Sequence, residues 1–202
     1  MNETSPNLHE PSTLSRLPLL IDLFYGFSIA NGLSDAIKST IEKRSMFQWL
    51  FLGAALLLGL GDWLGYHVHV SHIPYRSLRR LLLDLLFPIL VYCLLLAPTL
   101  TPSATGVSYV EWIVLTYFAF AVQYSILLHR EVWGVQPSLL RVVLIAFVMS
   151  VAAVLSGFLF QSAVLQTVLG NFFATAAVGL WAYYNLSLVY QTMHSDSGTI
   201  TA

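Results

Sequence analysis

An aspartate and three histidines lie together at the end of the second apolar stretch, where they could form a metal site. The segment carries Asp62, His67, His69 and His72, and carboxylate and imidazole groups are common zinc ligands. Residues two apart on a helix diverge by about 200°, so His67 and His69 cannot bind one ion together while the segment is helical. The spacing therefore favours interfacial or proton-sensing histidines over a zinc site.

The other reactive residue types form no enzyme-like pattern. Cys93 is the single cysteine, lies in an apolar run and has no activating neighbour. Ser156 is followed by a glycine without the rest of a nucleophile elbow, and no catalytic triad is recognisable. Asp84 follows Arg80 by four residues, which fits either a local ion pair or a partner for another helix. We therefore expect no enzyme, no cofactor and no bound metal.

The composition of the chain predicts that helices in a membrane position these residues. Of the 202 residues, 57% are hydrophobic and 9% are charged, whereas about a quarter of an ordinary soluble domain is charged. A helix needs about twenty mostly apolar residues to cross a bilayer. Six stretches qualify: Leu17–Ile37, Phe47–Val68, Leu81–Ala97, Val107–Leu128, Leu139–Phe160 and Val164–Tyr190. The predicted fold class is all-α, a polytopic membrane protein of about six transmembrane helices.

Polar ends and loop charges predict how the helices sit in the membrane. Residues 1–15 and 192–202 are expected to be disordered tails around a transmembrane domain at 16–191. Basic residues are more numerous on one side, which places both termini in the cytoplasm. The inner segments carry Arg16, Arg76, Arg79, Arg80, Arg130 and Arg141, and the outer loops Lys38, Lys43 and Arg44. The net charge of −1 provides no basic field for nucleic acid.

The first predicted helix is the most polar of the six. At 100° per residue, one side carries Leu20, Phe24, Phe27, Ser28, Asn31 and Asp35, and the opposite side carries Asp22, Gly26, Ile29 and Leu33. A helix that is polar on both sides is expected to be surrounded by protein or to line a cavity. The alternative is that Ser28 and Asn31 bond neighbouring helices while Asp35 lies among the lipid headgroups.

Motifs in the first half of the chain carry a family resemblance. Arg16 and Asp22 keep the spacing of an Arg-x-x-x-Phe-Ser-Asp motif, with leucine and isoleucine in place of Phe-Ser. Trp63 and His67 precede a basic linker, and Asp84 lies in a leucine-rich stretch where an asparagine is usual. Over residues 16–100 this order resembles the lysosomal and bacterial potassium channels built from six-helix units. Asp22-Leu-Phe-Tyr-Gly is also similar to an element of the low-temperature-requirement A family.

The resemblance implies a tetramer in which the first helix of each copy lines a central pore. Carried over by position, the pore-lining residues are Leu20, Phe24, Phe27, Asn31 and Asp35. Phe27 would form a hydrophobic constriction, Asn31 a polar contact for the ion and Asp35 an acidic ring that favours cations. Asp22 would join Arg16, Trp63, His67 and Asp84 in a network that holds the helices together.

Three functions follow from these patterns. We expect an oligomeric cation channel, permeable to potassium, in a bacterial inner (plasma) membrane, with the lipid bilayer, monovalent cations and further copies of the chain as partners. One alternative is a non-conducting subunit that anchors a cytoplasmic protein, for which the basic loop at Arg76, Arg79 and Arg80 is a docking surface. Another is a transporter or membrane enzyme that uses Asp22, Asp62, Asp84 and the histidines.

Overall fold

Six long helices make up the computed structural model of the chain, which describes residues 17–38, 46–70, 75–100, 107–131, 137–160 and 162–195. They are α1 (Leu17–Lys38), α2 (Met46–Gly65), α3 (Leu78–Leu96), α4 (Tyr109–Glu131), α5 (Pro137–Leu159) and α6 (Ala163–Ser195). Each contains a stretch long and apolar enough to cross a membrane, and the described residues include no strand. The predicted all-α fold with six transmembrane helices is confirmed.

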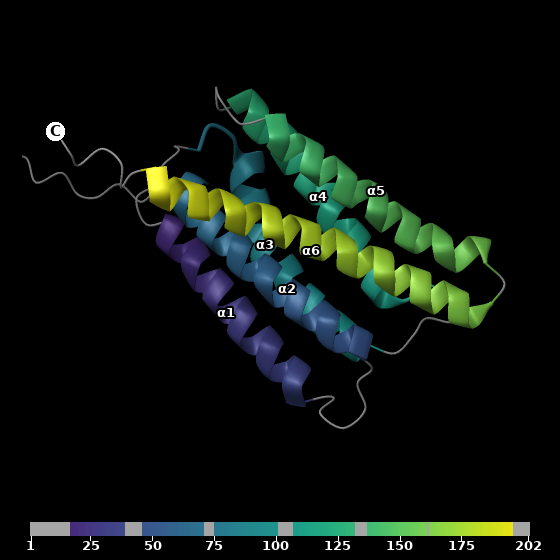
Figure 1. Cartoon of the computed structure of the whole chain (residues 1–202). Coiled ribbons are helices and arrows are strands. Elements are labelled where there is room, and N and C mark those ends of the chain that lie inside the picture. Colours follow the sequence, from purple (N-terminus) through teal and green to yellow (C-terminus); the bar gives the residue numbers. More distant parts are fainter. Residues whose placement is uncertain are drawn as a thin grey trace, which may run out of the picture.

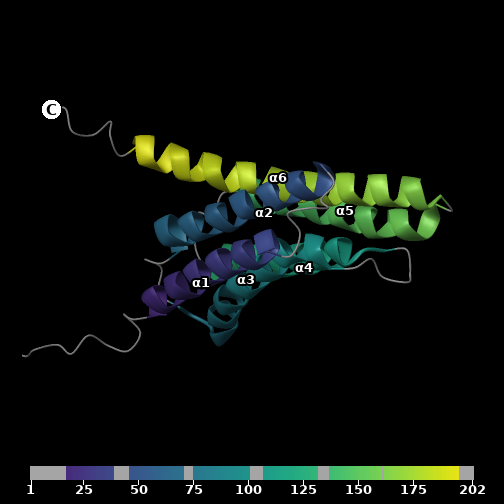
Figure 2. The same ribbon diagram turned by 90° about the horizontal axis from the view of Figure 1, so that it is seen from below.

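The helices form two layers of three. Seen from below, α2, α5 and α6 lie in one layer and α1, α3 and α4 in the other (Figure 2). Within the layers α6 packs against both α2 and α5, and α3 packs against both α1 and α4. Helix α1 forms one edge of the bundle, and its first residues lie at the same end as the last residues of α6 (Figure 1). Side chains from both layers therefore meet in the space between them.

Glycines let neighbouring helices approach closely, both between the layers and within them. A Cβ atom at Gly59 of α2 would lie 2.7 Å from Cγ1 of Val91 on α3, and one at Gly61 would lie 3.1 Å from Cβ of Asn185 on α6. In α1, a Cβ atom at Gly32 would lie 2.9 Å from a side-chain carbon of α3. Small residues at such positions allow van der Waals packing between transmembrane helices, where lipid provides no hydrophobic driving force.

Several helix ends differ from the prediction, and at the start of α3 the cause is local. Helix α3 begins at Leu78, three residues before the predicted start, because the Ser77 side chain accepts a hydrogen bond from the backbone N–H of Arg80 at 3.2 Å and caps the helix. Helix α2 continues as a π-helical turn at Tyr66–Val70. Helix α6 continues to Ser195, so its last residues lie within the range expected for the C-terminal tail.

The orientation of α1 corrects one prediction. The buried side of α1 consists of Ile21, Tyr25, Ser28, Gly32 and Ala36. Ser28 therefore does not lie on the outward side with Phe27 and Asn31, as the helical wheel predicted. Seven residues after Ile21, it is rotated by only roughly 20° from that fully buried residue. The outward side is narrower than predicted and ends before Ser28.

Candidate functional site

The predicted pore-lining residues lie along one side of α1, away from the buried side. Leu20, Phe24 and Phe27 are exposed, while Asn31 and Asp35 are half-buried. The amide of Asn31 donates a hydrogen bond to the backbone oxygen of Phe27 at 2.8 Å. The carboxylate of Asp35 accepts one from the hydroxyl of Tyr92 on α3 at 3.1 Å. The polar groups of this side are therefore bonded within the chain, and its aromatic rings point outward.

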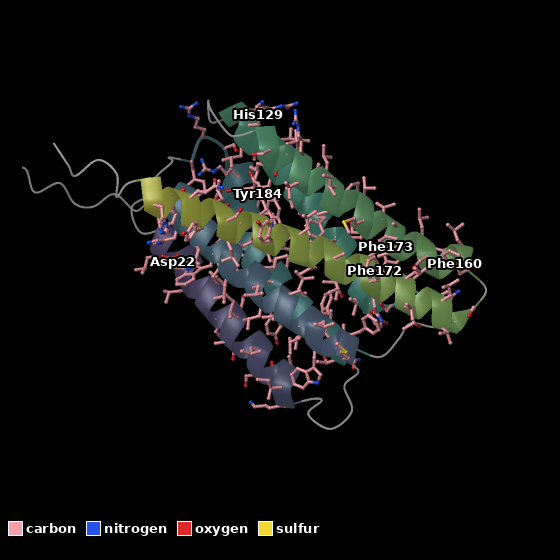
Figure 3. All side chains as sticks on the ribbon, in the orientation of Figure 1. Asp22, His129, Phe160, Phe172, Phe173 and Tyr184 are labelled. Carbon is pink, nitrogen blue, oxygen red and sulfur yellow. The ribbon has the colours of Figure 1, made fainter. Side chains whose placement is uncertain are left out.

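Part of the predicted helix network comes together at the end of the bundle where α1 begins. Asp22, labelled in Figure 3, accepts a hydrogen bond from the indole N–H of Trp63 at 3.0 Å. The Nδ1 atom of His67 lies 3.6 Å from the other oxygen of the same carboxylate. These contacts join α1 to α2. Asp84 makes its ion pair with Arg80 instead, and Arg16 lies outside the described residues.

A cavity of about 120 Å³ lies between the two helix layers, in the same half of the bundle. Its walls come from α1, α2, α3, α4 and α6, with one residue of α5. They contain two carboxylates and six aromatic rings. The lining residues are Tyr25, Asp62, Gly65, Tyr66, Asp84, Phe87, Tyr117, Ala121, Tyr124, Ser125, Leu128, Leu139, Trp181, Asn185 and Leu188. Few of them belong to the predicted sites, so the structure adds a candidate site to those of the sequence.

Asp62 connects three helices at this cavity. Its Oδ1 atom accepts hydrogen bonds from the indole N–H of Trp181 at 3.0 Å and from the amide of Asn185 at 2.6 Å. Its Oδ2 atom accepts one from the hydroxyl of Tyr117. All three donors are neutral, and no lysine, arginine or histidine of the described chain forms an ion pair with Asp62. The carboxylate is thus well solvated by dipoles, but its charge is not balanced by a cationic side chain.

The second carboxylate of the cavity belongs to a buried ion pair. Nε of Arg80 lies 3.9 Å from Oδ2 of Asp84, and the two residues are 0% and 3% exposed. The Arg80 guanidinium also lies over the ring of Tyr75, 4.9 Å from its centroid. The hydroxyls of Tyr75 and Tyr66 are 3.1 Å apart. Burial, and next the nearby charge of Asp84, raise the pKa of Tyr75 above its usual value, so its ring stays neutral beside the pair.

The charges of the cavity do not cancel. Arg80 offsets Asp84, and ionised Asp62 leaves one negative charge among neutral donors. An uncompensated carboxylate in a membrane interior is costly, so such groups bind a proton or face a cation. The arrangement is suited to binding one monovalent cation or one proton.

A third carboxylate, on Glu111, has a structural role. Its Oε2 atom accepts a hydrogen bond from the backbone N–H of Ser108 at 2.7 Å, and the Ser108 hydroxyl faces the N–H of Glu111 at 3.5 Å. This reciprocal pair is a capping box that starts α4. Its side chain packs against Gly170 of α6, where a Cβ atom would meet the carboxylate. Glu111 was not among the predicted residues, although the Ser-x-x-Glu spacing signals it.

The predicted histidine cluster does not converge on one point. Asp62 bonds residues of α4 and α6, whereas His67 lies beside Asp22 of α1. Within the ranges that the structure describes, no three histidine, cysteine, aspartate or glutamate side chains could hold a metal ion. The side chain of His69 and all of His72 lie outside those ranges.

The tyrosines of the cavity carried no signal in the sequence, since aromatic residues also occur throughout the lipid-facing surface. Helical spacing places Trp181 and Asn185 on one side of α6, and Tyr117, Ala121 and Tyr124 on one side of α4, but it does not show that these two sides meet. Comparison of the chain with protein-family models, with curated proteins and with solved structures found no match.

Proposed function

We propose that the chain is one subunit of an oligomeric cation channel, permeable to potassium, in which α1 of each copy lines a central pore. The observation that carries the proposal is the outward side of α1, where the exposed ring of Phe27 is followed by the amide of Asn31 and the carboxylate of Asp35. The position of α1 at an edge of the bundle supports it, because an edge helix is accessible to other copies (Figure 1).

The order of residues along α1 fits a pore. A carboxylate and an amide on a membrane-crossing surface are expensive against lipid, but they are solvated when they face water. Phe27 would narrow the pore and repel water when closed. Asp35, three residues before the end of α1, would form an acidic ring at one mouth and attract cations. With both termini in the cytoplasm of a bacterial inner membrane, that mouth is the outer one. A tetramer is the assembly that the family resemblance implies.

Potassium flux from liposomes that contain the purified protein tests this assignment. We expect flux from the parent protein and a larger flux from Phe27→Ala, because the smaller side chain widens the constriction. Phe172→Ala on α6 is the matched control: Phe172 is 55% exposed against 65% for Phe27, and it lies on another helix (Figure 3). Equal flux from the parent protein and Phe27→Ala would show that α1 does not line the pathway.

Asp35→Asn separates the acidic ring from the hydrogen bond with Tyr92. The asparagine keeps an oxygen that can accept from the Tyr92 hydroxyl, so the packing of α1 on α3 is retained. We expect the preference for potassium over chloride to fall while the protein stays folded. No flux from any correctly inserted variant would favour the alternative of a non-conducting subunit that anchors a cytoplasmic protein.

The cavity at Asp62 favours a second candidate, a transporter that carries a small cation through each subunit. Its carboxylate lies within the bundle rather than on the surface of α1. Counterflow of labelled ligand, in which internal unlabelled ligand accelerates uptake, is expected for a carrier and not for a pore. Neither candidate assigns a catalytic role to any residue.

A further inference from the structure

We propose that the cavity between the helix layers is a binding site for a small methylated ammonium cation, one per chain, with Asp62 as its counter-ion. The proposal concerns the interior of a single subunit. It therefore stands apart from the pore proposed along α1, and binding can be measured whether or not the protein conducts.

Charge is the first argument. The Arg80–Asp84 pair is internally neutral, and within the described ranges the hydrogen-bond donors to Asp62 are the neutral side chains of Tyr117, Trp181 and Asn185. A single positive charge in the cavity would neutralise the site. A dication would leave it positively charged, and an anion would face two carboxylates.

The aromatic lining identifies the kind of cation. Six of the lining side chains are aromatic: Tyr25, Tyr66, Phe87, Tyr117, Tyr124 and Trp181. The ring of Phe87 meets those of Tyr117 and Tyr124 edge-on, at centroid distances of 5.5 and 5.4 Å. Rings arranged at steep angles around a cavity with a carboxylate are the arrangement by which proteins recognise methylated ammonium groups, through cation–π attraction.

The same lining disfavours a dehydrated metal ion. A hard cation such as Ca²⁺ needs six to eight oxygen ligands, whereas both oxygens of Asp62 already accept hydrogen bonds. Most other lining groups present ring or aliphatic carbon. A methylated ammonium needs no inner-sphere ligands, since its charge is spread over methyl groups that contact ring faces.

The volume limits the size of the ligand. An engineered apolar cavity of about 150 Å³ holds benzene, so the 120 Å³ here limits the ligand to a compact group of about that size. Tetramethylammonium, with five non-hydrogen atoms in a nearly spherical shape, is comparable in volume to benzene. The lining residues of α4 extend from Tyr117, near the middle of the helix, to Leu128, about 16 Å further along it. Leu128 is three residues from the end of α4, which places that end of the cavity close to the membrane surface.

The local backbone of α2 is unusual at the same end. The π-helical turn begins at Tyr66, one of the lining residues, directly after Gly65. π-Helical turns are rare in proteins, and those that occur are often found at functional sites. Here the turn follows Asp62 of the cavity and contains His67, which lies beside Asp22.

Equilibrium binding of radiolabelled tetramethylammonium to the full-length protein, purified in a detergent without a choline headgroup, tests the proposal. We expect saturable binding of one ion per chain. Asp62→Asn keeps the size of the side chain and removes its charge, so affinity should fall by at least about tenfold. The matched control is Glu111→Gln, which neutralises a buried carboxylate outside the cavity and should leave affinity unchanged.

Two further measurements keep the test decisive if Asp62→Asn does not fold. Ala121→Leu fills the cavity from α4 without changing any charge and should abolish binding. An excess of tert-butanol, a neutral molecule of the same shape, should not displace the ion. Absence of saturable binding to the folded parent protein would overturn the proposal. So would unchanged affinity in Ala121→Leu, or displacement by tert-butanol.

Discussion

Replacing Asp62 by alanine tests the polar contact that joins α2 to α4 and α6. The carboxylate of α2 accepts hydrogen bonds from Tyr117 of α4 and from Trp181 and Asn185 of α6. Each donor side chain is buried, with exposures of 0% for Tyr117 and 7% for the other two. Asp62→Ala removes the acceptor from all three at once and leaves three polar groups facing an enlarged cavity.

The expected cost is about 3 kcal/mol of unfolding free energy. A lost hydrogen bond between transmembrane helices costs about 0.6 kcal/mol on average and up to roughly 1.7, and bonds to charged groups lie at the upper end. The loss of three bonds at about 1 kcal/mol each raises the equilibrium constant of unfolding by about a hundredfold, at roughly 1.4 kcal/mol per factor of ten. Asp62→Asn keeps one acceptor oxygen and should cost about 1 kcal/mol.

The assay is reversible unfolding in mixed micelles with increasing dodecyl sulfate, followed by far-ultraviolet circular dichroism. A double-mutant cycle with Trp181→Phe isolates one bond: the substitution should cost about 1 kcal/mol in the parent and less than about 0.5 kcal/mol with Asp62→Ala. If Asp62→Ala were as stable as the parent, or more stable, desolvation of the carboxylate would outweigh its three hydrogen bonds. The account of Asp62 as a connector of α2, α4 and α6 would then be refuted.

Three other outcomes are expected. Gly59→Ala should lower the unfolding free energy by about 1–3 kcal/mol in the same assay, because the new Cβ atom would lie 2.7 Å from a valine of α3; no change would mean that the helices separate easily. In a Cys93→Ser background, Phe27→Cys should form disulfide-linked oligomers in membranes, whereas Phe172→Cys should not, and the reverse pattern would exclude an α1-lined pore. The pKa of Tyr75 is higher in the folded protein than in the unfolded chain, so above about pH 10 the unfolded chain ionises first and the free energy of unfolding falls. Tyr75→Phe should therefore reduce the loss of thermal stability between about pH 10 and 12, and an unchanged loss would contradict the burial of this ring.

Hydropathy alone predicted the six helices, because a bilayer demands about twenty apolar residues from each crossing. It was less informative at their ends, where local contacts decide. Ser77 starts α3 before its apolar run begins, and α6 continues past its last apolar residue as far as Ser195. The outward side of α1 was predicted by residue spacing except at Ser28, which lies at the boundary where a few degrees of rotation decide burial.

The cavity could not be predicted, since its residues meet only through the arrangement of the helices. Asp62 stands among histidines in the sequence, although their spacing already disfavoured a metal site. In the structure its partners lie 55 to 123 residues away, on α4 and α6. Helical spacing shows which residues share one side of a helix, but not which helix that side faces. For the same reason Asp84 fitted two roles equally until its pairing with Arg80 was visible.

A hydrogen bond near each of its ends tethers helix α1 to the bundle. Asp22 bonds Trp63 of α2 at one end, and Asp35 bonds Tyr92 of α3 at the other, about 20 Å away along the helix axis. Between the tethers, α1 packs closely on α3 at Gly32, where a Cβ atom would lie 2.9 Å from a side-chain carbon of Leu95. A tilt of about 5° around one tether moves the other end by roughly 2 Å, more than a hydrogen bond tolerates. Loss of either hydrogen bond therefore allows α1 to tilt about the one that remains.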